Sequence, residues 1–350
     1  MGKLKKLTGY RLFLPLSCLI IVLLINLITT PTFFRITINN GVLYGYIIDV
    51  INRASELVVL AVGMTLVVSA SAGTDISVGA VMAVAAAVCT RVLAGGEVSV
   101  NEYANPYVLA VLAALAAAVV CGGFNGLLVA KLKIQPMVAT LILFTAGRGI
   151  SQLVTNGQIT YIRVDGYKLL GNNIPGIPIP TPIFVAVIVV VLTYILLKKT
   201  AMGMYIQSVG INERASRLVG LKSVKIIWMA YAFCGLCAGI AGLVASSRIY
   251  SADANNIGLN MELDAIAAVA LGGNSLGGGR FSLLGSVIGA YTIQALTTTL
   301  YAMSVPADQI PVYKAIVVIL IVAVQSEELK KFRKRLASRH SSKNVEGGVA

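Results

Sequence analysis

The chain has 350 residues, of which 57% are hydrophobic and only 12% are charged, and its mean hydropathy is +0.85. A soluble protein of this length carries about 25% charged residues to cover its surface. The composition therefore excludes an ordinary soluble domain and favours a polytopic, all-α membrane protein. A β-barrel is not expected, because the apolar runs are continuous rather than alternating.

The net charge is +14, and the basic residues gather between the apolar runs. The positive-inside rule explains this clustering more simply than nucleic-acid binding does, so no nucleic-acid partner is expected. With a cytoplasmic N-terminus and ten crossings, most of the 28 Lys and Arg fall on the inner side, and the C-terminus is also cytoplasmic. The basic clusters are 1–11, 131–133, 198–225 and 330–343.

Ten apolar windows follow one another along the chain, separated by turn signals. We expect a cytoplasmic N-terminal segment (1–11), a transmembrane domain (12–325) and a cytoplasmic tail (326–350). The eighth window is short and is typical of a half-helix or re-entrant segment, so the prediction is eight to ten helices, with ten favoured. The windows are 12–30, 54–71, 76–94, 106–130, 136–154, 182–198, 226–247, 262–273, 281–302 and 312–325.

The stretch "SASAGTDISVGA" (69–80) interrupts two apolar runs with glycines, hydroxyls and one carboxylate. An ionised carboxylate at membrane depth is costly, so we expect Asp75 near the cytoplasmic face, where water reduces that cost. Asp also suits the cap of a helix that starts at Ile76. We interpret the stretch as a helix break near a gate, formed by Gly73, Asp75, Ser77 and Gly79. A glycine-rich break also follows the acidic helix 260–273, a weak internal echo of the segment 54–80.

The longest polar insert is a cytoplasmic loop at 199–225 that contains "NERASRLVG" (212–220). Its pattern predicts a short helix with Asn212 as N-cap, an acidic first turn and Gly220 at the C-terminus. One side of this helix is apolar and is flanked by arginines. It is either a solvated connector or a helix that docks into a partner. The residues assigned to partner coupling are Gly210, Asn212, Glu213, Arg214, Ala215, Arg217, Leu218 and Gly220.

A passage for a polar solute needs scattered amides and hydroxyls rather than many charges. Arg148 is the most conspicuous charge inside a predicted span, and pairing with Glu262 or Asp264 would explain it. Most of the other candidates equally suit helix caps or loops. The candidate path residues are Asn125, Gln135, Thr140, Arg148, Asn255, Asn256 and Asp264.

No pattern in the chain indicates catalysis. The segment "GGNSLGGGR" (272–280) lacks the Lys-Ser/Thr of a phosphate-binding loop, and the single histidine, His340, lies in the tail. Cys234 and Cys237 fall mid-helix, which favours helix packing over redox chemistry, as do the pairs Gly122/Gly126 and Gly235/Gly239. We expect no enzyme activity, metal or cofactor in this chain.

Several stretches resemble one known family. "AGTDISVGA" is similar to the signature of the branched ribose/galactose/xylose permeases of ABC importers, although Thr74 and Ile76 depart from it. "VGINERASRLVGLKSVKI" resembles the loop by which such permeases contact their ATPases. The blocks 125–158 and 262–280 also match, so the resemblance covers about 50–325 in order, and it is nearest to galactofuranose importers.

The resemblance implies the membrane subunit of an ATP-driven sugar importer in the bacterial inner membrane, with galactofuranose as the expected sugar. Its partners would be a second, different permease, a cytoplasmic ATPase that binds ATP and Mg²⁺, and a periplasmic sugar-binding protein. The alternative is an ion- or proton-coupled secondary sugar transporter that works alone. That alternative needs a relay of buried carboxylates.

Overall fold

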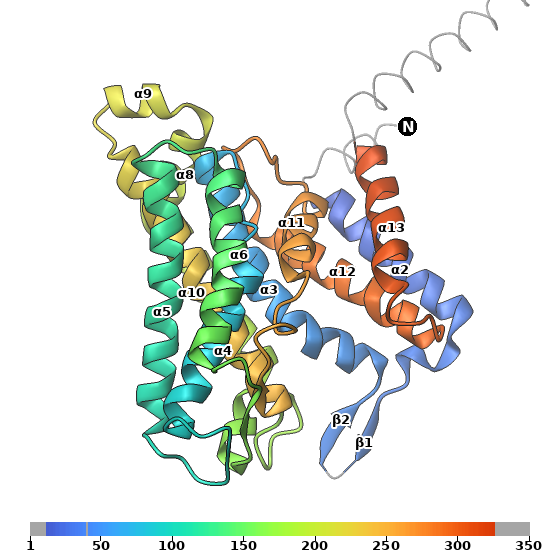
Figure 1. Cartoon of the computed structure of the whole chain (residues 1–350). Coiled ribbons are helices and arrows are strands. Elements are labelled where there is room, and N and C mark those ends of the chain that lie inside the picture. The colour runs from blue at the N-terminus through green and yellow to red at the C-terminus, as the bar shows by residue number, and fades with distance from the viewer. Residues whose placement is uncertain (1–11, 40, 326–350) are drawn as a thin grey trace, which may run out of the picture.

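The computed structural model describes residues 12–39 and 41–325, and most of this part of the chain is helical (Figure 1). The segments expected to be cytoplasmic, 1–11 and 326–350, lie outside the described residues. The predicted all-α bundle is confirmed. Its helices are α2 (Phe13–Thr29), α3 (Tyr46–Ser71), α4 (Val78–Ala94), α5 (Tyr107–Ala130), α6 (Pro136–Val154), α7 (Thr181–Lys199), α8 (Met202–Ile211), α9 (Glu213–Leu218), α10 (Ser223–Ile249), α11 (Met261–Leu271), α12 (Leu283–Ala302) and α13 (Ile310–Gln325).

Within the described part, six helices are long and apolar enough to cross a membrane: α3, α5, α6, α7, α10 and α12. The helices α2 and α4 and the apolar part of α13 are shorter. Helix α11 has 11 residues, which gives about 16 Å of helix, roughly half of a 30 Å hydrocarbon layer. The eighth predicted window is therefore a half-helix.

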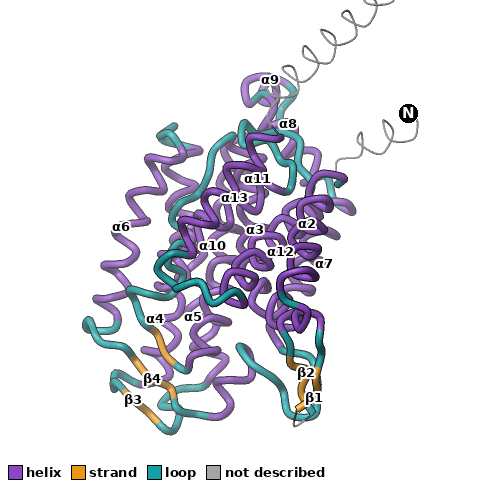
Figure 2. Tube along the Cα trace, turned by 90° about the vertical axis from the view of Figure 1, so that its right-hand side faces the viewer, coloured by secondary structure: helices purple, strands orange, loops and turns teal. Residues whose placement is uncertain are grey.

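Short strands gather at the end of the bundle opposite α9 (Figures 1 and 2). An antiparallel hairpin precedes α3, and a separate three-stranded sheet has the order β3-β4-β5. Strand β3 lies between α4 and α5, β4 follows α6, and β5 follows α10, so this sheet joins three loops at one end of the bundle. The elements are η1 (Pro31–Phe34), β1 (Thr37–Asn39), β2 (Val42–Tyr44), β3 (Ser99–Val100), β4 (Thr160–Ile162), η2 (Asp165–Leu170) and β5 (Ser251–Ala252).

Helix α3 forms the centre of the bundle: 89% of its most apolar window is buried, against 28% for α5 and 22% for α7. Small residues allow its neighbours to approach closely. A Cβ on Gly235 of α10 would lie 2.4 Å from the Ala118 carbonyl oxygen of α5, and one on Gly63 would lie 3.0 Å from the Cys237 Cβ. The expectation that these glycines and cysteines serve helix packing is confirmed.

Helices α3 and α10 run antiparallel, and each ends in a left-handed residue, Ala72 (φ 53°) or Tyr250 (φ 57°). After each end the chain turns back and begins a shorter helix, α4 or α11. The two turns meet, because a Cβ on Gly79 would lie 2.2 Å from the Gly258 carbonyl oxygen. The helix pair α3–α4 thus resembles the pair α10–α11, with the two pairs running in opposite directions. The sequence comparison had instead matched α3 with α11.

The contact between α5 and α10 gives a first prediction. Gly235→Ala should destabilise the fold by about 1–3 kcal/mol, because the new Cβ has no room against the α5 backbone. The measurement is the loss of folded protein on heating in detergent. Gly149→Ala on α6 is the control, since nothing lies within 4 Å of its Cβ position. Equal stability of the two variants would contradict the packing described.

Candidate functional site

The first break is the segment between α3 and α4 (72–77), and in it the chain folds back into the protein. The Asp75 backbone N–H reaches the Met64 sulfur at 3.5 Å, so the chain doubles back alongside α3. Helix α4 then begins at Val78, with Ser77 as its N-cap. The predicted start at Ile76 was therefore two residues early.

Asp75 is buried, with 2% of its surface exposed. One of its carboxylate oxygens accepts hydrogen bonds from the Ser77 backbone N–H (2.9 Å) and the Ser77 hydroxyl (2.6 Å), and a longer one from the Asn125 amide (3.5 Å). The expectation that water solvates this carboxylate was wrong. Hydrogen bonds from the protein offset the cost of burying it.

Two further contacts hold the break against the start of α6. The Ile76 N–H donates to the Thr140 hydroxyl at 3.2 Å. A Cβ on Gly73 would lie 2.3 Å from the Pro136 Cβ. The positive φ of the turn falls on Ala72 rather than Thr74, so the departure from the family signature at Thr74 causes no left-handed strain.

Arg148 holds the second break, which is the non-helical segment between α10 and α11 (250–260). Its guanidinium donates to the Ala254 and Ile257 carbonyl oxygens at 2.9 and 2.5 Å. The predicted pairing with Asp264 was wrong, because Asp264 accepts two hydrogen bonds from Lys314 of α13, at 2.6 and 2.8 Å. Arg148 satisfies carbonyls that a non-helical segment leaves without backbone partners.

Glu262, the other partner considered for Arg148, is 4% exposed. Its Oε2 lies beside the position that a Cβ on Gly79 would occupy, 2.3 Å away. Neither this oxygen nor the second terminal nitrogen of Arg148 has a hydrogen-bond partner among the described residues. In the described part of the chain, Arg148 and Glu262 form no ion pair within 4.0 Å of each other.

The remaining path candidates are not gathered in one place. The side-chain oxygen of Asn255 accepts a hydrogen bond from the Gln152 amide at 2.6 Å, and the Asn256 amide donates one to the Asp253 carboxylate at 2.6 Å. Gln135 is exposed just before α6, at the α9 end of the bundle. Asn125 and Thr140 support the first break. The structure therefore divides the predicted path residues among separate polar clusters, and their contact with a solute stays a prediction.

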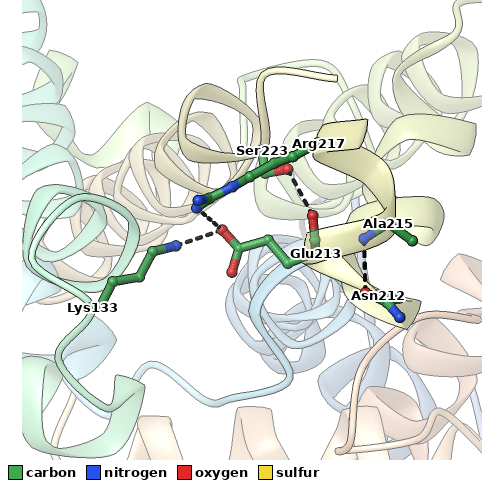
Figure 3. Close-up of polar contacts among 6 residues, drawn as sticks. All are labelled: Lys133, Asn212, Glu213, Ala215, Arg217 and Ser223. Atoms are coloured by element: carbon green, nitrogen blue, oxygen red, sulfur yellow. Dashed lines mark hydrogen bonds and ion pairs between the residues drawn. The ribbon is translucent and has the colours of Figure 1, made fainter. Parts of the chain in front are cut away.

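The polar insert at 199–225 folds as predicted around a short helix. The Asn212 side chain accepts from the Ala215 N–H at 2.9 Å, which confirms it as the N-cap of α9 (Figure 3). Gly220 has φ +85°, and the Leu221 N–H donates back to the Ser216 carbonyl at 3.0 Å. This is the glycine-terminated helix end that the sequence indicated.

Glu213 fastens α9 to the loop between α5 and α6. Its carboxylate accepts from Lys133, which lies between α5 and α6, at 2.5 Å, and from Arg217 one turn on (Figure 3). The Ser223 hydroxyl also reaches the Glu213 carbonyl at 3.5 Å. Partial burial opposes ionisation, but the hydrogen bonds and charges of the two cations outweigh it, so the pKa of Glu213 lies below its ordinary value. Sequence reasoning missed Lys133, since 80 residues separate it from Glu213.

Gly210 places the base of this segment against two other parts of the protein. A Cβ there would lie 1.7 Å from the Ser69 carbonyl oxygen of α3 and 2.7 Å from the Gly279 nitrogen. The Gly279 N–H donates to that same Ser69 oxygen at 3.0 Å. A Cβ on Gly278 would lie 2.9 Å from the Ala72 Cβ. The α8–α9 segment, the first break and the glycine-rich loop after α11 are thus in direct contact.

Beyond this base, the tip of α9 is uncovered. The apolar side chains of Leu218 and Val219 are 89% and 77% exposed, and Ile211 is 66% exposed. Ala215 and Arg214 are exposed beside them. An exposed apolar patch beside basic residues, on a segment whose base is tightly packed, is typical of a docking surface rather than of an intramolecular packing surface.

This architecture, a bundle of membrane-length helices with two internal breaks, is that of a helical multi-pass membrane permease. The chain belongs to the family described as "Branched-chain amino acid transport system / permease component", whose model matches residues 46–325. Three similar proteins are sugar permeases by name, and the chain covers nearly all of each.

It is 44% identical to the galactofuranose transporter permease protein YtfT of Escherichia coli K12, over 93% of this chain and 92% of that one. It is 37% identical to the fructose import permease protein FruF of Bifidobacterium longum, over 99% and 96%. It is 35% identical to the ribose import permease protein RbsC of E. coli K12, over 89% and 93%. No solved structure matches the chain significantly.

The hydrogen bonds around Asp75 give a second prediction. Ser77→Ala should destabilise the protein by about 1–3 kcal/mol, because it removes the 2.6 Å bond to a buried carboxylate and leaves Asn125 without its 2.8 Å partner. Thermal unfolding in detergent measures the loss. Ser55→Ala is the matched control: Ser55 is also buried but bonds only the Ile51 carbonyl of its own helix. Equal losses in the two variants would show that Asp75 does not depend on Ser77.

Proposed function

We propose that this chain is the membrane subunit of an ATP-driven ABC sugar importer and that a separate ATPase docks on α9. The observation that carries the proposal is the α8–α9 segment. It presents exposed Leu218 and Val219 at its tip, and its base at Gly210 touches the end of α3 and the loop after α11. Sugar permeases among the similar proteins support the same reading.

The distribution of charge supports an orientation with α9 in the cytoplasm. Apart from the buried Asp75 of the first break, the described loops at the α9 end carry many cations and one acidic residue, Glu213, whereas the strand end carries both signs. Cytoplasmic loops are enriched in Lys and Arg. The strand end would then face the periplasm, and both termini would be cytoplasmic. The α9-end cations are Lys131, Lys133, Lys198, Lys199, Arg214, Arg217, Lys222, Lys225 and Arg280.

The proposed coupling runs from the ATPase to the first break. A partner that moves α9 displaces the base at Gly210, and that base touches Ser69 directly and reaches Ala72 through Gly278. A displacement there shifts the break and the start of α4 relative to α3. Such a shift exchanges an outward opening for an inward one. Tightly packed contacts transmit it, because closely packed backbones do not deform continuously.

The proposed substrate is a monosaccharide, with galactofuranose favoured by the 44% identity to a galactofuranose permease. The proposed partners are a second, homologous permease, an ATPase that binds ATP and Mg²⁺, and a periplasmic sugar-binding protein. We assign no cofactor and no enzyme activity to this chain. The inner membrane of a bacterium is the proposed location.

Docking on α9 gives a third prediction. Leu218→Asp with Val219→Asp should weaken binding of the partner ATPase by about tenfold or more, because the change removes an exposed apolar contact. Co-purification and titration in nanodiscs measure this binding. Ile38→Asp with Tyr44→Asp is the control, since it places the same two charges on side chains of the β1–β2 hairpin that are 72% and 54% exposed. Undiminished ATPase binding by the double variant would contradict the docking role.

Reconstitution tests the function as a whole. Proteoliposomes that contain this chain and its second permease should take up labelled galactose, ribose or fructose only when the ATPase, the binding protein and ATP are all present. Accumulation by this chain alone, driven by an ion gradient, would instead establish the secondary transporter. Hydrolysis without uptake of any of the three sugars would overturn the proposed substrate class.

A further inference from the structure

A cavity of about 530 Å³ lies between α3, α10, α11 and α12. Its walls include residues of the second break, among them Asn256 and Gly258, and it extends along α12 to Tyr301. Helices α10 and α12 both end nearby, at the strand end of the bundle (Figure 1). The cavity therefore occupies the half of the protein opposite α9.

One wall of the cavity is a stripe of polar side chains on α12. Gln294, Thr297 and Tyr301 of α12 line it at positions i, i+3 and i+7, which places an amide, a hydroxyl and a phenol on one face. Across the cavity, Arg53 and Glu56 of α3 repeat the three-residue spacing. Hydrogen-bonding side chains inside membrane helices line protein interiors or water-filled cavities, and they mark substrate pathways.

Most of the charged residues that line the cavity form ion pairs within the described part of the chain, and the two that do not, Arg53 and Asp253, have opposite charges. Glu56 forms an ion pair with Arg248 at 3.0 Å, and the two side chains are only 15% and 18% exposed. Asp264 forms its ion pair with Lys314 at 2.6 Å, behind the wall. These pairs leave hydrogen-bonding groups in the cavity but no unopposed cluster of one sign. Such a site favours a neutral polar ligand over an ion.

We propose that this cavity binds a neutral, hydroxyl-rich ligand of monosaccharide size, with the α12 stripe of Gln294, Thr297 and Tyr301 as its hydrogen-bonding wall. A volume of about 530 Å³ lies within the range of 300–1,000 Å³ that small-molecule sites occupy. The choice of a sugar as that ligand rests on the proposed function. Asp264, an expected path residue, and the amide-bearing loop around Asn256 complete the site.

Cysteine protection tests the cavity directly. In the complete transporter in membranes, Thr297→Cys should react with a small water-soluble thiol reagent, and millimolar galactose, ribose or fructose should slow the reaction at least about twofold, as half-occupancy requires. Galacturonate, which is charged, should not protect. Thr193→Cys on α7 is the matched control: Thr193 is buried, bonds only its own helix at Val189, and lies outside the cavity.

The outcomes separate this inference from the proposed function. Uptake of one of the three sugars without protection of Thr297→Cys would overturn the assignment of the cavity as the binding site and leave the proposed import function intact. Protection by a sugar without ATP-driven uptake would uphold the cavity and overturn the importer. Equal protection by galacturonate would overturn the preference for a neutral ligand.

Substitution of the stripe supplies the second measurement. Gln294→Leu with Thr297→Val should raise the KM for sugar uptake about tenfold, the expected loss for two hydrogen bonds, with a smaller change in the maximal rate. Thr193→Val should leave the KM unchanged. An unaltered KM in the double variant would overturn the assignment of the stripe.

Discussion

The structure depends on one constraint, which is that backbone polar groups have no water to bond inside a membrane. A helix that breaks there must recover its hydrogen bonds from side chains. At the first break the Asp75 carboxylate accepts from the Ser77 N–H, and the Thr140 hydroxyl accepts from the Ile76 N–H. Asn125 donates to the Ser77 hydroxyl and so extends the network around the buried Asp75. At the second break, Arg148 bonds two carbonyls that no helix satisfies. The burial of Asp75, Asn125 and Thr140 is thus explained by the first break.

The sequence alone predicted much of the architecture, because its signals are local. Apolar windows mark helices wherever they occur, and the cap at Asn212 and the glycine end at Gly220 follow from residues a few positions apart. The short eighth window correctly indicated a half-helix. The family resemblance was confirmed by the match over residues 46–325.

The parts that sequence reasoning missed are contacts between distant segments. Lys133 and Glu213 are 80 residues apart, and Asp264 and Lys314 are 50 apart. Arg148 was assigned a carboxylate because opposite charges in a membrane favour pairing, yet backbone carbonyls satisfy it instead. The polar stripe on α12 did carry a sequence signal, in its spacing of three and four residues, but its meaning required the facing wall of α3.

The small sheet at the strand end restricts how the bundle can move. Strand β4 bonds both β3 and β5, so main-chain hydrogen bonds tie together the loops that follow α4, α6 and α10. The same three helices have no such ladder at their other ends among the described residues. The sheet therefore fixes the spacing of these three loops through main-chain bonds, which do not depend on the identity of the side chains. At the α9 end the corresponding contacts are made by glycines and side chains, so single substitutions can loosen that end but not the strand end.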